Sequence, residues 1–159
     1  MRRTNPMMMA LVVGAVLIVG CSSDSKSSTS TSSGGGGITV PAATGAPVSL
    51  IAGDKSDTEQ FFTLAPTEAK AGPVTFTFQN TGTKQHEMIV LKTDTPYDQL
   101  PIGADNKVSE DASVGEISET DPGKTVSKTF DLAAGNYVLV CNIEKHYGQG
   151  MRAAFTVTP

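Results

Sequence analysis

The sequence predicts an all-β fold, an antiparallel β-sandwich within residues 38–159. Two observations lead to this prediction. Short runs rich in β-branched and aromatic residues follow one another through this part of the chain, and clusters of Gly, Pro and Asn separate them. Residues 74–78 also alternate apolar and polar side chains, which is the period of a strand with one buried face. The length suffices for one domain with a single core, and the sequence contains no internal repeat.

We expect about eight strands in this domain, each of them a short run of this kind. In chain order they cover residues 47–51 (PVSLI), 60–64 (QFFTL), 74–78 (VTFTF), 86–91 (HEMIVL), 113–117 (SVGEI), 125–130 (TVSKTF), 136–141 (NYVLVC) and 152–157 (RAAFTV). The turn residues between them include Gly72-Pro73, Asn80-Thr81-Gly82, Asp121-Pro122-Gly123 and Ala134-Gly135-Asn136. In the seventh strand, alternation places Tyr137, Leu139 and Cys141 on one face, so we expect the Cys141 sulfur between the sheets.

Residues 93–112 interrupt this pattern of strands. The segment contains Pro96, Pro101 and Gly103 together with the acidic residues Asp94, Asp98, Asp105, Glu110 and Asp111. Residues 97–100 could form a short helical turn, but we predict mostly loop here. We interpret the segment as a solvated surface excursion rather than a dedicated docking surface, although a cationic partner could use its acidic residues for electrostatic steering.

We interpret residues 1–20 as a targeting signal that is not part of the fold. Arg2 and Arg3 form the basic N-terminal region that signal peptides have. Residues 7–19 are an apolar run of the length of a signal-peptide hydrophobic region, which is short for a membrane-spanning helix. The run ends in Ile18-Val19-Gly20-Cys21, which resembles the lipobox of bacterial lipoproteins. The resemblance implies cleavage before the cysteine and its acylation with chains such as palmitate. A plain signal peptide or an uncleaved anchor is the alternative.

Residues 22–37 are almost all Ser, Thr and Gly, so we predict a flexible tether. The predicted organisation is a signal peptide at 1–20, lipidated Cys21 and tether at 21–37, and a globular domain at 38–159. Removal of the signal leaves 10 basic and 16 acidic residues, a net charge of −6. The sequence shows no basic patch with interleaved aromatic residues, so we expect no nucleic-acid partner. We expect a protein outside the cytoplasm, lipid-anchored to the cell membrane.

Four side chains form a candidate metal site: His86, Cys141, His146 and Met151. Three of them follow a Cys-x4-His-x4-Met pattern near the C-terminus, and the chain contains only two histidines and two cysteines. With Cys21 acylated, Cys141 has no disulfide partner, and a metal would occupy an otherwise reactive thiol. A thiolate, two imidazoles and a thioether are the ligands of a mononuclear blue-copper (type 1) site. They do not suit Mg²⁺ or Ca²⁺, and a thioether is a poor fourth ligand for structural zinc.

Each of these residues has a simpler interpretation when it is taken alone. Met151 is typical core filler, a single histidine at a strand start is usually structural, and a buried cysteine behaves as a small hydrophobe. The coincidence of all four favours the metal site. We expect Met88, two residues after His86, to pack beneath the site rather than to bind metal. Tyr97 and Tyr147 are also expected to be packing residues.

Residues of roughly 45–159 resemble the cupredoxins, the plastocyanin/azurin superfamily. The ligand pattern carries the resemblance, together with the segments Asn80-Thr-Gly-Thr-Lys-Gln-His86 and Gly135-Asn-Tyr-Val-Leu-Val-Cys141. The Cys-x4-His-x4-Met spacing is most similar to the rusticyanin and sulfocyanin branch. The resemblance implies an eight-stranded Greek-key sandwich with one copper ion at one end. It also implies that His86 is a buried ligand and that His146 is the partly exposed ligand through which electrons pass.

The sequence departs from the usual cupredoxin pattern at Glu87 and at the pair Glu144-Lys145. Glu87 stands where many relatives have an Asn whose side chain ties the two ligand segments together. Glu87 must therefore accept from backbone N–H groups or face solvent. Glu144 and Lys145 stand where many relatives have Pro-Gly. We expect these charges beside the electron port to make docking more sensitive to salt, although the two opposite charges could partly cancel.

The favoured function is that of a membrane-tethered electron carrier. We expect a monomer that exchanges single electrons with a redox protein such as a cytochrome, an oxidase or a reductase. The sequence suggests no open coordination position and no acid–base pair, so we expect no catalytic residues and no enzymatic activity.

The alternative function is copper binding and delivery outside the cytoplasm. Delivery proteins need exposed Met or His clusters, and the mature chain has only Met88 and Met151. A copper-free binding module ranks third. A single-copper catalyst such as a nitrite reductase ranks last, because that class needs a second copper ion and further histidines.

Overall fold

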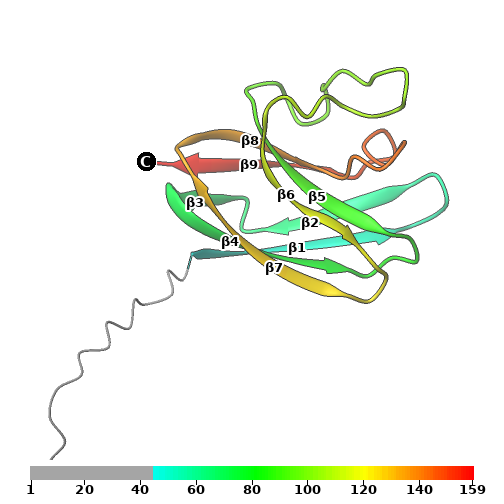
Figure 1. Cartoon of the computed structure of the whole chain (residues 1–159), viewed down its shortest axis with the longest axis horizontal. Coiled ribbons are helices and arrows are strands. Elements are labelled where there is room, and N and C mark those ends of the chain that lie inside the picture. The colour runs from blue at the N-terminus through cyan, green and yellow to red at the C-terminus, as the bar shows by residue number, and fades with distance from the viewer. Residues whose placement is uncertain (1–44) are drawn as a thin grey trace, which may run out of the picture. The chain divides into compact units, whose positions relative to one another are not determined.

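The computed structural model describes residues 45–159, which form nine strands and no helix (Figure 1). The strands are β1 (Ala46–Asp54), β2 (Gln60–Ala65), β3 (Glu68–Lys70), β4 (Gly72–Asn80), β5 (His86–Lys92), β6 (Ser113–Thr120), β7 (Thr125–Leu132), β8 (Gly135–Val140) and β9 (Arg152–Thr158). Within the described part of the chain, no helix has the length and hydropathy to cross a membrane. The predicted signal peptide, Cys21 and the tether lie outside the described residues.

The strands build two sheets, and the prediction of an all-β sandwich is confirmed. The four-stranded sheet has the order β2-β1-β4-β7, and the five-stranded sheet has the order β3-β9-β8-β5-β6. Most neighbours are antiparallel, but β1 pairs with β4, and β3 with β9, in parallel. The expectation of a purely antiparallel arrangement is wrong for these pairs, because the chain enters the second sheet at β3 and returns to the first at β4. The short β3 was not predicted, because its three residues show no apolar alternation.

The main core is built from alternate residues of the strands. In β4, Val74, Phe76 and Phe78 are fully buried, whereas Thr77 between them is exposed. Phe76 packs edge-to-face against Phe155 of β9, with ring centroids 5.2 Å apart. Burial of an apolar side chain of this size contributes about 1.5–3 kcal/mol. The period-two pattern therefore determines which face of β4 points inward.

A second apolar cluster covers the other face of the five-stranded sheet. Its members are Ile89 and Leu91 of β5, Val138 and Val140 of β8, and Leu100, Val108 and Tyr147 from connecting segments. Residues 93–112, called the excursion below, supply Leu100 and Val108. Most side chains of the excursion are exposed, as expected, but these two pack against the sheet. Residues 97–100 contain a turn but no helix, so the expectation of mostly loop is confirmed here.

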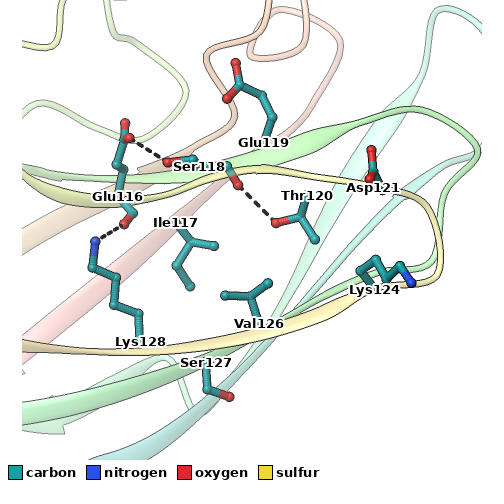
Figure 2. A pocket seen from close by; sticks show the side chains of 10 residues that line it. All are labelled: Glu116, Ile117, Ser118, Glu119, Thr120, Asp121, Lys124, Val126, Ser127 and Lys128. Carbon is teal, nitrogen blue, oxygen red and sulfur yellow. Dashed lines mark hydrogen bonds between the residues drawn. The ribbon is translucent and has the colours of Figure 1, made fainter.

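The strands β6 and β7 each form one edge of a sheet, and a pocket lies between them (Figure 2). Lys128 Nζ of β7 donates to the backbone oxygen of Glu116 in β6 at 2.9 Å. Charged side chains on an exposed edge oppose the addition of another strand. This side of the sandwich is therefore protected against pairing with a second chain.

Candidate metal centre

The four predicted ligands come from three neighbouring elements of the structure. His86 begins β5, Cys141 directly follows β8, and Met151 directly precedes β9. His146 lies between the last two, in residues 141–151, called the ligand loop below. The side chains of His86, Cys141 and Met151 are fully buried, and His146 is 7% exposed. All four are thus removed from bulk water.

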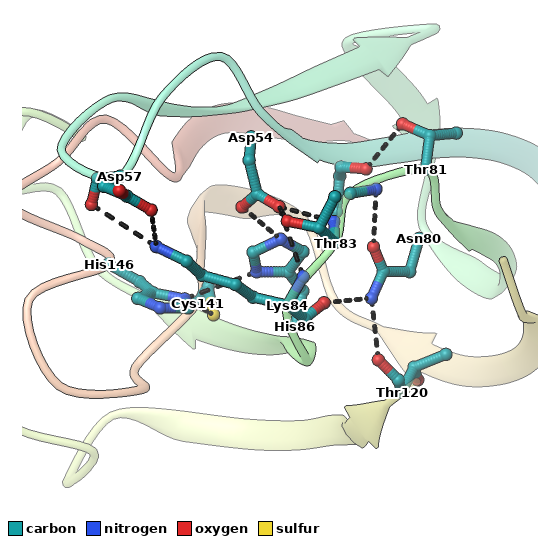
Figure 3. A network of polar contacts seen from close by, with 12 residues as sticks. Asp54, Asp57, Asn80, Thr81, Thr83, Lys84, His86, Thr120, Cys141 and His146 are labelled. Atoms are coloured by element: carbon teal, nitrogen blue, oxygen red, sulfur yellow. Dashed lines mark hydrogen bonds and ion pairs between the residues drawn. The ribbon is translucent and has the colours of Figure 1, made fainter. Parts of the chain in front are cut away.

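Three donor atoms converge in the structure (Figure 3). Nδ1 of His146 lies 3.3 Å from Nδ1 of His86 and 3.3 Å from Sγ of Cys141. Ligand atoms of the three side chains all lie within 4.8 Å of one another. A single metal ion can satisfy the lone pairs of all three at once, which is otherwise difficult in a buried site.

Met151 is joined to the other predicted ligands through the backbone. Its N–H donates to the His146 carbonyl at 3.1 Å, and its own carbonyl accepts from the Cys141 N–H at 3.1 Å. Its side chain belongs to the same buried cluster as Cys141. Met88 is also fully buried in that cluster, which agrees with its expected packing role. The backbone bonds therefore place Met151 at the end of the ligand loop, beside Cys141 in the fold.

Burial controls the protonation of the donor atoms. It raises the pKa of Cys141 to about 12, although two backbone N–H groups favour the thiolate. It lowers the pKa of His146 to about 4, and it lowers the pKa of His86 despite the charge of Asp54 nearby. Near pH 7 and without metal, the site therefore holds a protonated thiol and two neutral imidazoles. A metal has to displace only the thiol proton.

Asp54 faces the other ring nitrogen of His86 (Figure 3). Its Oδ1 lies 2.9 Å from His86 Nε2, although the ring N–H is not aligned well enough for a hydrogen bond. Its Oδ2 accepts from Thr83 N–H at 2.6 Å, Thr83 Oγ1 at 3.1 Å and Lys84 N–H at 3.2 Å. Burial raises the pKa of Asp54, but these bonds and the charge of His86 outweigh it, so the pKa lies below its ordinary value. An ionised carboxylate beside Nε2 favours the proton there and leaves Nδ1 free for a metal.

Asp54 was not among the predicted site residues. Val48, Leu50 and Ala52 are buried at alternate positions of β1, and Asp54 continues this inward series. A carboxylate in the inward register of an apolar strand is the signal that could have identified it. The predicted strand at 47–51 ended too early for the alternation to reach it.

The segment between β4 and β5 holds Asp54 and His86 together. Asn80 is fully buried, and its Nδ2 donates to the carbonyls of Lys84 and Thr120, both at 2.8 Å. Its Oδ1 accepts from the Gly82 N–H at 2.9 Å. A Cβ at Gly82 would lie 2.8 Å from His86 Nε2, so only glycine permits this close approach.

Glu87 links the two segments that carry the candidate ligands. Its Oε1 accepts a hydrogen bond of 3.0 Å from the Asn142 N–H. This contact agrees with the expectation that Glu87 accepts from a backbone N–H, and the side chain is buried rather than facing solvent. Burial, followed by the negative charge of Glu119, raises the pKa of Glu87 to about 7. The two segments are therefore joined by a carboxyl group that is partly protonated near neutral pH.

These residues fit a type 1 copper ion. Cys141 supplies a thiolate, and His86 and His146 supply two nitrogens within 4.8 Å of it and of each other. Met151, fully buried at the end of the ligand loop, carries a thioether. This mixture of soft and borderline donors suits copper in both of its common oxidation states. The neighbouring Asp54 is the kind of partner that orients a ligating histidine in metal sites.

Comparisons with known proteins agree with this geometry. The family model described as copper binding proteins, plastocyanin/azurin family, matches residues 51–158. Dithionite-reduced auracyanin from the photosynthetic bacterium Roseiflexus castenholzii is 25% identical, with a TM-score of 0.50, over 72% of this chain and 100% of its own. Rusticyanin from Thiobacillus ferrooxidans is 21% identical, with a TM-score of 0.54, over 72% of this chain and 79% of its own. Comparison with curated protein sequences found no match.

Proposed function

Because the chain belongs to the plastocyanin/azurin family of copper-binding proteins, we propose that it carries single electrons between redox partners outside the cytoplasm. The family and the His86, Cys141 and His146 cluster support one type 1 copper site. The observation that carries the proposal is the convergence of three buried donor atoms within 4.8 Å, one of them a cysteine sulfur. We assign His86, Cys141 and His146 as the strong ligands and Met151 as the weak axial ligand.

The protein's part in electron transfer is to keep the same ligands in place in both oxidation states. The bound copper ion supplies the Cu(II)/Cu(I) couple. His86 is positioned by β5 and by Asp54, while Cys141 and Met151 are joined by a backbone hydrogen bond of 3.1 Å. Side chains held on rigid elements move little when the charge of the metal changes. A small rearrangement keeps the barrier to electron transfer low.

We propose His146 as the residue through which electrons enter and leave. It is 7% exposed, the largest exposure among the four candidate ligands. The neighbouring Glu144 and Lys145 form an exposed ion pair with a distance of 3.1 Å. Because opposite charges this close partly cancel, we expect only a modest effect of salt on docking through this pair.

We propose that a lipid on Cys21 holds the protein at the outer face of the cell membrane. The support is the lipobox-like sequence that ends at Cys21 and the Ser/Thr/Gly-rich residues 22–37 that follow. A flexible tether would let the copper domain reach more than one membrane-bound partner. Partners of the electron-transfer class fit this placement, namely a cytochrome, an oxidase or a reductase.

An optical titration of residues 38–159 tests the proposal. The Cu(II) form should show an intense blue or green thiolate-to-copper band that ascorbate bleaches and reoxidation restores. The absence of this band would contradict the electron-carrier function. Copper delivery is the competing function, but the burial of all four candidate ligands opposes rapid exchange. Retention of Cu(I) in the presence of a mild chelator supports the carrier, and rapid loss supports delivery.

A further inference from the structure

The excursion contacts the ligand loop at three places. Its residues bind Asn142, which follows Cys141, and Tyr147, which follows His146. They also bind the backbone of Lys145, which precedes His146. Each of these three residues is the sequence neighbour of a candidate ligand. The excursion therefore does more than cover the apolar face of the sheet.

Both the oxygen and the nitrogen of the Asn142 side-chain amide form hydrogen bonds with the excursion. Its Oδ1 accepts from the Val108 N–H at 2.8 Å, and its Nδ2 donates to the Val108 carbonyl at 3.0 Å. The same Nδ2 donates to Glu110 Oε1 at 2.7 Å. Asn142 is 2% exposed, and its backbone N–H is already bound to Glu87. The residue after Cys141 is therefore held from two sides.

Tyr147 makes the second contact through its hydroxyl group. Tyr147 Oη accepts from the Leu100 N–H at 2.9 Å and donates to the Tyr97 carbonyl at 2.9 Å. Its ring is buried in the cluster that also contains Leu100 and Val108. On the other side, Arg152 donates to the Tyr147 carbonyl at 2.7 Å. The residue after His146 thus has both its side chain and its carbonyl fixed.

Lys145 makes the third contact through its backbone. Its φ of 73° is in the left-handed region, which residues other than glycine usually avoid. Its N–H donates to the Asn106 carbonyl at 3.1 Å. A strained backbone conformation persists only where surrounding contacts enforce it. The hydrogen bond from Lys145 to the excursion is one such contact, and Lys145 directly precedes His146 in the sequence.

We propose that the excursion is a clamp that holds the ligand loop in its metal-binding conformation, with Asn142 and Tyr147 as positioning residues for Cys141 and His146. The inference rests on the proposed copper site. A loop that is already in place loses little conformational freedom when the metal binds, and it resists opening when the metal leaves. If the excursion only covered the sheet, Leu100 and Val108 would suffice and the polar contacts would have no effect on the site.

The first test compares Tyr147→Phe with Tyr97→Phe in the copper-loaded protein. Tyr147→Phe removes the hydroxyl and its two hydrogen bonds but keeps the buried ring. Tyr97→Phe is the matched control, because Tyr97 is 43% exposed on the excursion and meets Tyr147 through its backbone carbonyl, which the substitution keeps. At 25 °C, Tyr147→Phe should release Cu(I) to a chelator about tenfold faster and shift the visible band of Cu(II), whereas Tyr97→Phe should match the wild type.

A second pair of variants avoids any risk to the core. Glu110→Ala removes an exposed carboxylate that binds Asn142, and Asp111→Ala removes a neighbouring carboxylate that binds Ser109 instead. We expect faster copper release only in Glu110→Ala, by about three- to tenfold.

The outcomes separate this inference from the proposed function. Melting temperatures that fall equally with and without copper, together with unchanged release rates and spectra, would show a merely structural role and overturn the clamp. A wild-type protein that binds copper and cycles reversibly, with variants indistinguishable from their controls, would also overturn the clamp alone. A wild-type protein that takes up no copper would overturn both.

Discussion

Glu87 Oε1 and the Asn142 N–H are joined by a hydrogen bond of 3.0 Å between residues 55 positions apart in the sequence. The bond connects the residue after His86 to the residue after Cys141. Glu87 was recognised in the sequence as a departure from the Asn that many cupredoxins have at this position, and here its buried carboxyl group makes the connection. The contact therefore depends on a group whose pKa is raised to about 7, chiefly by burial.

Glu87→Ala should lower the free energy of unfolding by roughly 1–3 kcal/mol, because the buried Asn142 N–H loses its acceptor. Glu87→Gln is the matched control, since its side-chain oxygen can still accept the bond. Urea unfolding of both metal-free variants measures the difference. Equal losses in the two variants would show that the carboxyl group matters for a reason other than this bond.

Asp54→Ala should weaken copper binding by about 10–100-fold, because His86 loses the carboxylate that keeps the proton on Nε2. Asp57→Ala removes a carboxylate from the same region whose side chain is 98% exposed, and it should change the affinity little. Competition with a chelator of known affinity measures both constants. If the two variants behave alike, Asp54 does not orient the histidine.

Met151→Gln should leave copper bound but lower the reduction potential, because an oxygen donor favours Cu(II) more than a thioether does. Met88→Leu alters another fully buried methionine of the same cluster and should leave the potential nearly unchanged. Voltammetry of the purified proteins provides the comparison. A potential that does not change in Met151→Gln would exclude Met151 as the axial ligand.

Copper uptake at pH 7 should release about one proton for each ion bound. Burial raises the pKa of Cys141 to about 12 and lowers the pKa of His146 to about 4, so only the thiol carries a proton to be displaced. The apparent affinity for Cu(II) should therefore rise about tenfold per pH unit from about pH 5 to pH 8. Below about pH 4 the dependence should steepen, because His146 also binds a proton.

Calorimetry in buffers of different ionisation enthalpy counts the released protons. Cys141→Ser provides the control, because a serine hydroxyl keeps its proton in this pH range. Release close to zero in the wild type would mean that the thiolate already exists before the metal binds.

The strands and the types of donor atom were predictable from local features of the chain. Alternation over residues 136–141 predicted that Tyr137, Leu139 and Cys141 point inward. All three belong to the main core, whereas the equally buried Val138 and Val140 belong to the cluster on the other face. The parallel pairing of β1 with β4 was not predictable in this way. Alternation shows which face of a strand is buried, but it does not show which strand lies beside it.

The contacts of the excursion with the ligand loop were also not predictable from the sequence. Its prolines and acidic residues correctly indicated a mostly exposed loop, and this composition gave no sign of its contacts with Asn142 and Tyr147. Those contacts are made largely by backbone groups, which every residue carries. They depend on where the loop lies after folding rather than on its side-chain pattern.

The presence of a thiolate, two imidazoles and a thioether is a property of the chain, and these atoms alone select copper over harder metals. The approach of the thiol and the two imidazoles to within 4.8 Å of one another depends on the pairing of β5 with β8, which brings the beginning of one strand beside the end of the other. The same is true of Asp54 and His86, which belong to different sheets. Such contacts follow from the joint burial of many apolar residues, and no short stretch of sequence contains that information.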